Sequence, residues 1–114
     1  MYKAIHISPM IPSFNLDETS KFFVDLFEFT IVKDGDYMIL NKDDIFIHIL
    51  RAGEVGDMEF YYVIDGLDQL WEKIKGNLEG IKVKPPFNQD YGMREFHIIV
   101  PHTKVLMFVA EEMN

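Results

Sequence analysis

No cysteine occurs among the 114 residues of this chain. Its absence excludes disulfides, catalysis by a thiolate, and zinc or iron–sulfur sites that use cysteine ligands. Basic side chains are also scarce, because 11 Lys and Arg stand against 19 Asp and Glu and leave a formal net charge of -8. Binding of nucleic acid requires a basic patch that neutralises phosphate groups, so we expect no nucleic-acid partner. A ligand with a cationic group is better matched to this charge.

Long apolar runs are missing as well. A membrane-spanning helix needs roughly 20 successive apolar residues, and no segment comes near that length. The first residues, MYKAIHISPM, lack the apolar centre of a signal peptide. We therefore expect a cytoplasmic protein without a membrane partner. Hydrophobic residues nevertheless make up 48% of the chain and aromatic residues 14%, which suits a single packed domain spanning residues 1–114.

Two segments have the apolar spacing of amphipathic helices, and each begins with Leu-Asp. The first is LDETSKFFVDLFEF, with Asp17 as its expected N-cap, and the second runs from Leu67 to Leu78 in GLDQLWEKIKGNL. A strand-like run precedes each helix, KAIHISPMI and MEFYYVI, and a β-rich segment and a hairpin follow. The chain therefore predicts an α+β fold of two β-α-β-β-β repeats, residues 1–56 and 57–114, with curved mixed sheets and helices outside.

The two repeats can be aligned residue by residue. The two Leu-Asp pairs set an offset of 51 in the first half of each repeat, which matches Ser8 with Glu59. The hairpins YMILNKDDIFIHIL and HIIVPHTKVLMFVA align at an offset of 60, which matches Tyr37 with His97. The additional residues of the second repeat are expected in KVKPPFNQDYGM, as a loop that its prolines keep out of regular structure.

Three short motifs in the second half carry a resemblance to known proteins. They are GLD at 66–68, YGMREF at 91–96 and FVAEE at 108–112, and Pro9 adds to them. With the duplicated plan, these residues resemble the glyoxalase/bleomycin-resistance/extradiol-dioxygenase superfamily, which has the vicinal oxygen chelate fold. They are most similar to the bleomycin-resistance proteins, so the resemblance implies binding of a drug without its cleavage, as in antibiotic resistance.

One stretch departs from that family's pattern. Family members usually join the last two strands with Asp-Pro-x-Gly, whereas this chain has Val-Pro-His-Thr at 100–103. We expect an altered turn here, because a positive φ is costly for the β-branched Thr103.

The resemblance also implies where a metal would bind in metal-dependent members of the superfamily. Those four positions fall at Ser8, Ile47, Glu59 and Met107. Among them Glu59 alone is a competent ligand, whereas a catalytic divalent site needs about three protein ligands. We therefore expect no metal, no cofactor and no catalytic residue. Two alternatives remain, a metal site of His6, Glu59 and His97, and a metal-free enzyme that uses Glu95 with His97.

Strand alternation sends Glu59 and Tyr61 to the face opposite Phe60 and Tyr62. The ligand-binding wall expected on the Glu59 side is aromatic and acidic, and consists of Tyr37, Glu59, Tyr61, Glu95, His97 and Met107. Such a wall suits a planar, partly cationic compound. The resemblance adds Tyr91, which replaces a Trp that lines the family's drug groove.

The first strand is interrupted by proline. Pro9 and Pro12 remove two backbone donors, so this strand cannot be a fully paired central strand. The resemblance implies that Pro9 is a hinge at which the strand crosses to a partner, giving a domain-swapped homodimer with a ligand groove at the interface. We therefore expect a dimeric protein that sequesters a small molecule. The alternatives are a metal-dependent lyase, dioxygenase or thiol transferase of the same superfamily, and a dimeric scaffold with a vestigial pocket.

Overall fold

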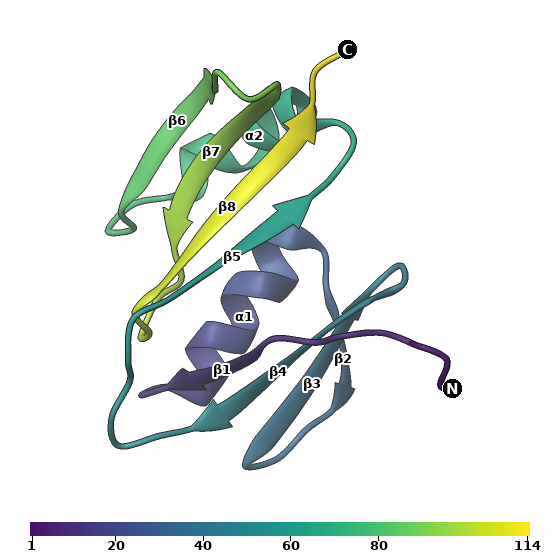
Figure 1. Ribbon diagram of the computed structural model, residues 1–114. Helices are drawn as coiled ribbons and strands as arrows, with labels where there is room; N and C mark the ends of the chain where they lie inside the picture. The colour runs from purple at the N-terminus through teal and green to yellow at the C-terminus, as the bar shows by residue number, and fades with distance from the viewer. The chain divides into compact units, whose positions relative to one another are not determined.

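Each half of the chain folds into one α-helix and one four-stranded sheet (Figure 1). The computed structural model describes residues 1–114, which divide into two units, Met1–Val55 and Gly56–Asn114. The first unit contains β1 (Met10–Ser13), α1 (Leu16–Phe27), β2 (Thr30–Lys33), β3 (Tyr37–Lys42) and β4 (Ile45–Arg51). The second contains β5 (Met58–Val63), α2 (Leu67–Ile74), the 3₁₀ helix η1 (Lys75–Asn77), β6 (Val83–Asn88), β7 (Met93–Ile99) and β8 (Val105–Glu112).

The two sheets have the same topology. Their strand orders are β1-β4-β3-β2 and β5-β8-β7-β6. In each sheet the first strand pairs in parallel with the last strand of the repeat, and the other neighbours are antiparallel. The prediction of an α+β fold built from two β-α-β-β-β repeats is confirmed. No helix in the structure combines the length and the apolar character that crossing a membrane requires.

The N-cap of helix α1 lies two residues earlier than the sequence predicts. Asn15 rather than Asp17 is the N-cap, since its side chain accepts a hydrogen bond of 3.1 Å from the backbone N–H of Glu18. Asp17 lies in the first turn, where its charge interacts favourably with the helix N-terminus. The apolar stripe of the helix packs against the sheet and buries Phe22, Phe23, Leu26 and Phe27 together with Met38, Leu40, Ile47 and Ile49. Each such side chain contributes about 1.5–3 kcal/mol when fully buried.

Helix α2 is shorter than its apolar spacing predicts. It ends at Ile74, and the chain continues through η1 before it reaches Leu78, which is still largely buried. The helix packs on the sheet through contacts such as Trp71 on Phe96, whose ring centroids lie 5.2 Å apart. The core of this unit is completed by Leu67, Ile98, Met107 and Val109.

The alignment of the repeats is correct for the first and last strands of each repeat, β1 and β4 with β5 and β8, and wrong for β3 with β7. Met10 pairs with His48 and Tyr61 pairs with Phe108, which agrees with offsets of 51 and 60. Tyr37, however, pairs with Leu50, and the corresponding residue Ala110 pairs with Glu95. Glu95, and not His97, is therefore the counterpart of Tyr37, at an offset of 58.

A longer hairpin turn explains this difference. Two residues separate the paired Lys42 and Ile45, whereas four separate Val100 and Val105, which are joined by a backbone hydrogen bond of 3.0 Å. The positive φ of the longer turn falls on His102, at 65°, so the β-branched Thr103 is spared that conformation. The hydroxyl of Thr103 instead donates to the Val100 carbonyl at 2.8 Å.

Two segments differ from the predicted strands. Pro85 and Pro86 were expected in a loop, but both lie within β6, an edge strand whose register shifts between Lys84 and Phe87. A bulged edge strand tolerates proline because the missing N–H is not needed for pairing. The predicted first strand is regular only from Met10. Residues 1–9, at the purple end of the chain in Figure 1, are an extended segment whose last residue, Pro9, accepts a hydrogen bond of 3.0 Å from the backbone N–H of His48 in β4.

Candidate functional site

The second sheet has one face toward α2 and one open face. Cross-strand partners point to the same side of a sheet, so the pairing assigns each side chain to a face. The side of α2 carries Phe60, Tyr62, Phe96, Ile98, Met107 and Val109, and the open face carries Glu59, Tyr61, Glu95, His97, Ile99, Leu106 and Phe108. The open face is the candidate functional site of this unit.

Glu95 lies at the centre of this face, fully buried although its side chain is acidic. Its carboxylate is surrounded by hydrogen-bond donors from three segments. They are His97 Nε2 at 2.7 Å, Gln89 Nε2 at 2.9 Å, Tyr91 Oη at 3.0 and 3.1 Å from the two oxygens, and Tyr61 Oη at 3.3 Å. A buried carboxylate is tolerated when donors satisfy both of its oxygens, and this one meets that condition.

The turn between β6 and β7 delivers two of these donors. Gln89 and Gly92 are joined by a backbone hydrogen bond of 3.3 Å, and Gly92 has a positive φ of 86° that few residues other than glycine adopt. This turn holds Tyr91 close to Glu95, and it brings the Tyr91 hydroxyl to 2.6 Å from the hydroxyl of Tyr61 on β5. The sequence YGMREF thus builds one side of the site by itself.

The cluster keeps Glu95 ionised. Burial alone would raise the pKa of this carboxyl group, but hydrogen bonds from His97, Gln89 and Tyr91, with the attraction of His97, outweigh burial and hold the pKa below its usual value. The opposite effect acts on Tyr91, whose pKa is raised by the hydrogen bond with Tyr61, by loss of water and by the nearby carboxylate. The site therefore combines a buried negative charge with a Tyr91 phenol that stays neutral.

Aromatic rings surround this charge on the open face. The ring of His97 stacks on Phe108 with centroids 4.2 Å apart and planes inclined by 27°. Tyr61 packs on the same Phe108 at 5.1 Å, and Phe87 meets the edge of His97 at 5.1 Å. Nearly half of the Tyr61 side chain remains exposed, so this aromatic wall is accessible from solvent.

Two open grooves adjoin the wall. The smaller, of about 190 Å³, is lined by Glu59, Phe60, Tyr61 and Phe108. The larger, of about 530 Å³, is lined by Asp57, Met58, Glu59, Lys82, Ile99, Thr103, Lys104 and Leu106. Glu59 is common to the linings of both grooves.

Most of the side chains predicted for the ligand-binding wall lie on this face. Tyr61, Tyr91, Glu95 and His97 form one hydrogen-bonded cluster, and Glu59 lies beside it. The predicted place of Met107 in the wall is wrong, because Met107 pairs with Phe60 and is buried on the side of α2. The rule that cross-strand partners share a face, applied to Tyr61, would have selected Phe108 instead.

Other residues of the site were missed or lie elsewhere. The sequence pattern does not predict Phe87 and Gln89 as site residues, because the prolines of their segment indicate a loop. Tyr37 belongs to the first unit, on the open face of its sheet, where its hydroxyl is hydrogen-bonded to His48 Nδ1.

Comparison of the sequence with known protein families and with curated proteins finds no match. Comparison of the structure finds a bleomycin resistance determinant encoded on the transposon Tn5, with a TM-score of 0.79 and 20% identity over 96% of this chain and 98% of that one. A bleomycin-binding protein from Streptomyces verticillus, complexed with copper(II)-bleomycin, follows with a TM-score of 0.75 and 20% identity over 100% and 99% of the two chains. The chain has the bleomycin-resistance fold.

This fold also occurs in an enzyme. A lactoylglutathione lyase from Agrobacterium tumefaciens has a TM-score of 0.77 and 16% identity over 96% of this chain and 94% of the lyase. The resemblance to the vicinal oxygen chelate superfamily is therefore confirmed at the level of the fold. The bleomycin-resistance fold carries more than one activity, so the activity of this chain has to be argued from its own side chains.

The residues present do not fit the metal site of the metal-dependent proteins. Ile47 and Met107, two of the four positions assigned by alignment, are buried on the helix sides of their sheets. The β8 residue that shares the face of Glu59 is Leu106, which cannot bind a metal. No group of three or more His, Asp or Glu side chains is arranged to hold a metal ion.

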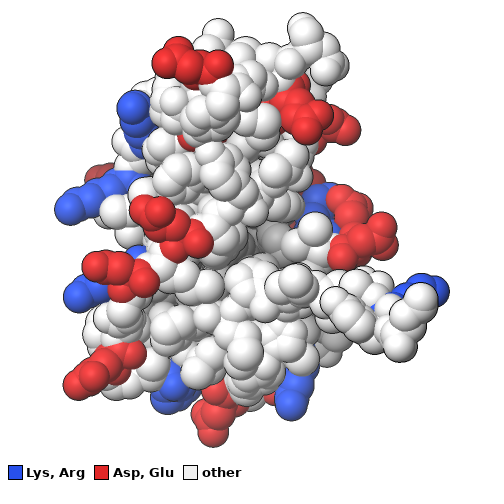
Figure 2. Space-filling view, viewed as in Figure 1, with Lys and Arg blue, Asp and Glu red and all other residues white.

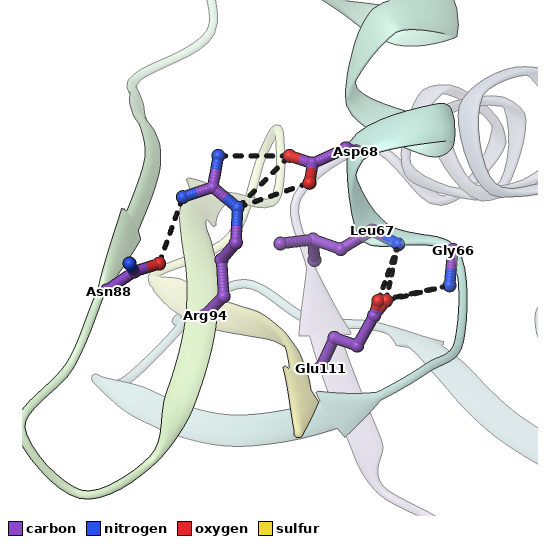
Figure 3. A network of polar contacts seen from close by, with 6 residues as sticks. All are labelled: Gly66, Leu67, Asp68, Asn88, Arg94 and Glu111. Carbon is purple, nitrogen blue, oxygen red and sulfur yellow. Dashed lines mark hydrogen bonds and ion pairs between the residues drawn. The ribbon is translucent and has the colours of Figure 1, made fainter. Parts of the chain in front are cut away.

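In this structure, hydrogen bonds and an ion pair connect the three motifs GLD, YGMREF and FVAEE (Figure 3). The carboxylate of Glu111, from FVAEE, accepts hydrogen bonds from the backbone N–H groups of Gly66 and Leu67, from GLD, at 3.0 and 3.3 Å. Arg94, from YGMREF, binds Asp68 of GLD at 3.0 Å and Asn88 at 3.1 Å. Arg94 therefore pairs with Asp68 and not with its neighbour Glu95, and these motifs stabilise the attachment of α2 to its sheet.

Charge on the visible surface agrees with the composition. On the face drawn in Figure 2 the basic side chains are scattered among acidic ones and form no continuous patch. That face therefore offers no continuous basic surface along which a phosphate backbone could be neutralised.

Proposed function

We propose that this protein binds and sequesters a planar, partly cationic small molecule on the open face of the second sheet, without a metal, a cofactor or a chemical reaction. The observation that carries the proposal is the aromatic wall of Tyr61, His97 and Phe108 around the buried carboxylate of Glu95. Aromatic faces bind planar rings by stacking, and negative charge beside them attracts a cation.

The grooves support a ligand larger than one ring. Glu59 lines both grooves, so a planar part stacked on Tyr61 and Phe108 leaves its cationic part near an acidic side chain. An interaction of this kind supplies both contact area and orientation. The likeness in fold to a bleomycin-binding protein is consistent with such a ligand.

We propose further that the chain acts as one domain of residues 1–114 within a homodimer, with the first strand exchanged at Pro9 and with a ligand groove at the interface. The extended residues 1–9 support this arrangement, because Tyr2, Ile5 and Ile7 are 92%, 75% and 98% exposed. A chain that leaves such large apolar side chains in water gains free energy by packing them on a partner. A dimer would bury them.

The experiment that tests the binding function is a calorimetric titration of metal-free bleomycin into the purified protein, with chelator present and at two salt concentrations. Micromolar or tighter binding at one drug per chain, weaker at the higher salt concentration, supports stacking beside an acidic groove. Tyr61→Ala and Glu59→Gln are expected to weaken this binding without unfolding the protein. Absence of heat at every concentration would contradict the proposal for this class of drug.

The alternative is a metal-dependent enzyme of the same superfamily. The likeness in fold to a lactoylglutathione lyase favours it, and the lack of a suitable ligand set opposes it. The metal content of the purified protein separates the two, and saturable binding of any ligand separates both from a scaffold with a vestigial pocket.

A further inference from the structure

The hydroxyl groups of Tyr61 and Tyr91 have too few protons to donate a hydrogen bond in every polar contact that they make with each other and with Glu95. Three short contacts join them with Glu95, namely Tyr61 to Tyr91 at 2.6 Å, Tyr91 to Glu95 at 3.0 Å and Tyr61 to Glu95 at 3.3 Å. Each phenol has one proton to donate, so two protons serve three contacts. An ionised carboxylate can only accept hydrogen bonds, so both of its phenol contacts require a proton from the phenol.

The distances indicate how the two protons are used. Tyr91 donates to Glu95, because this contact reaches both carboxylate oxygens. Tyr61 then donates to the oxygen of Tyr91, since that contact is the shorter of its two by 0.7 Å. The resulting chain runs from Tyr61 through Tyr91 to Glu95, and each bond strengthens the next one.

This series of hydrogen bonds leaves one acceptor without a donor. The Tyr61 oxygen ends the chain as an acceptor with no donor among its contacts in the site, and Tyr61 is 48% exposed on the open face. His97 directs its Nε2, and Gln89 one of its two amide N–H groups, at the same carboxylate, so neither of these donors serves the Tyr61 oxygen. The cluster therefore presents an acceptor, and no proton, at the position of Tyr61.

We propose that the site selects aromatic ligands that carry a hydrogen-bond donor, such as an amidinium, an ammonium or a ring N–H, and excludes aromatic carboxylates and phosphates. Tyr61 Oη accepts the ligand's N–H, and Glu95 is a positioning residue that sets the direction of both phenol protons without touching the ligand. This inference rests on the proposed function and names the chemistry by which its ligand is recognised. The ligand's N–H binds the phenol oxygen of Tyr61 and not Glu95, because the buried carboxylate of Glu95 already accepts hydrogen bonds from its neighbours.

The test compares two probes of similar size, benzamidinium and benzoate, by amide chemical shifts of β7 and β8 in wild-type protein and in Tyr61→Phe. Benzamidinium is expected to bind about tenfold more tightly than benzoate to wild type, which is the ratio that one charge-assisted hydrogen bond provides. Tyr61→Phe keeps the ring and the net charge, so it is expected to lower only the affinity for benzamidinium, by about tenfold. Tyr62→Phe, on the same strand but the opposite face, is the matched control and is expected to leave the ratio unchanged.

A second variant reverses the direction of the hydrogen bonds between Tyr61, Tyr91 and residue 95. In Glu95→Gln the amide N–H can donate to Tyr91, which releases phenol protons toward the open face, so benzoate is expected to gain affinity relative to benzamidinium. Equal binding of the two probes to wild type, no binding of benzamidinium, or an unchanged ratio in Tyr61→Phe would overturn the inference. These results are independent of the drug titration, because a site that prefers benzamidinium can still be too small or wrongly shaped for bleomycin.

Discussion

Glu95 combines complete burial with a negative charge, and its neighbours make this combination stable. A carboxylate removed from water loses its solvation and requires several donors in exchange. His97, Gln89 and Tyr91 supply them from one strand and one turn. Glu95 thus orders the other side chains of the site around itself.

We predict that Glu95→Gln lowers the free energy of unfolding at neutral pH by about 1–3 kcal/mol, because hydrogen bonds to a neutral amide are weaker than those to a carboxylate. The pKa of Glu95 is lower in the folded state than its ordinary value of 4.5, so the carboxylate stabilises the fold above that pH. This stabilisation is lost as the pH falls through the folded-state pKa.

Chemical denaturation of wild type and Glu95→Gln at several pH values measures this effect. The difference between the two proteins is expected to be largest at neutral pH and to shrink below pH 4.5. Glu112→Gln, an exposed residue at the end of β8, serves as the control and should cause little change at any pH. Equal stability of wild type and Glu95→Gln at neutral pH would show that the cluster is not formed.

Tyr91 provides a second prediction at the scale of single residues. Its pKa is raised by its hydrogen-bonded neighbours, by loss of water and by the charge of Glu95, so one of the five tyrosines is expected to ionise at a higher pH than the ordinary value. Glu95→Gln removes the neighbouring charge and should move this ionisation back toward the ordinary value, and Glu112→Gln should not. Ultraviolet titration of the phenolate measures both, and an identical late ionisation in Glu95→Gln would contradict the assignment.

At the scale of secondary structure, α2 depends on a side chain from a distant strand. The helix has eight residues, and its N-cap Gly66 has no side chain to satisfy the first backbone N–H groups. Glu111 of β8 performs this role instead, with its carboxylate at the helix N-terminus. The helix end is thereby fastened to the centre of the sheet.

We predict that Glu111→Ala destabilises the protein by about 1 kcal/mol, the usual cost of losing an N-terminal cap. Amide exchange at Gly66 and Leu67 is expected to become faster in this variant, and denaturation measures the loss of stability. Asp68→Ala, which removes an ion pair whose carboxylate side chain is 66% exposed, is the comparison and should cost less. Equal effects of the two substitutions would argue against capping.

At the scale of the whole molecule, the extended residues 1–9 are the feature that one chain by itself does not explain. Ile7 is 98% exposed, so a charged residue at this position leaves an isolated chain undisturbed but opposes packing on a partner. We predict that wild type is a dimer and that Ile7→Asp weakens the dimer at least about tenfold.

Sedimentation velocity at several protein concentrations measures this shift. Val32→Asp, on the edge strand β2 at a residue that is 59% exposed, is the control and should leave the dimer intact. A wild-type monomer at every concentration would reject the exchanged strand, as would a dimer that is indifferent to Ile7→Asp.

Metal content is a further property of the whole molecule. Because no suitable set of ligands is present, protein purified without chelator is expected to contain no stoichiometric divalent metal. Elemental analysis by mass spectrometry measures this directly. A tightly bound nickel, zinc, manganese or iron at one per chain would favour the enzymatic alternative over sequestration.

Local patterns were sufficient to predict the fold. The repeated Leu-Asp helices, the alternating strands and the motifs around 66–68, 91–96 and 108–112 each depend on nearby residues, and they led to the right topology. The N-cap error is a local one, because Asn15 caps the helix through the N–H of Glu18 only three residues on. The prolines are different, because they are accommodated by the position of β6 at the edge of its sheet.

The sequence by itself determined the two repeats, the α+β class and the side of β5 on which Glu59 and Tyr61 lie, because helical and strand periodicities are properties of short segments. Tertiary structure alone decided that Phe108 replaces Met107 in the wall. It also decided that the carboxylate of Glu95 is buried and hydrogen-bonded to its neighbours rather than exposed to a ligand. The physical reason is that strand register and hydrogen-bond partners depend on residues far apart in the chain. A difference of two residues in one turn changes which side chains meet.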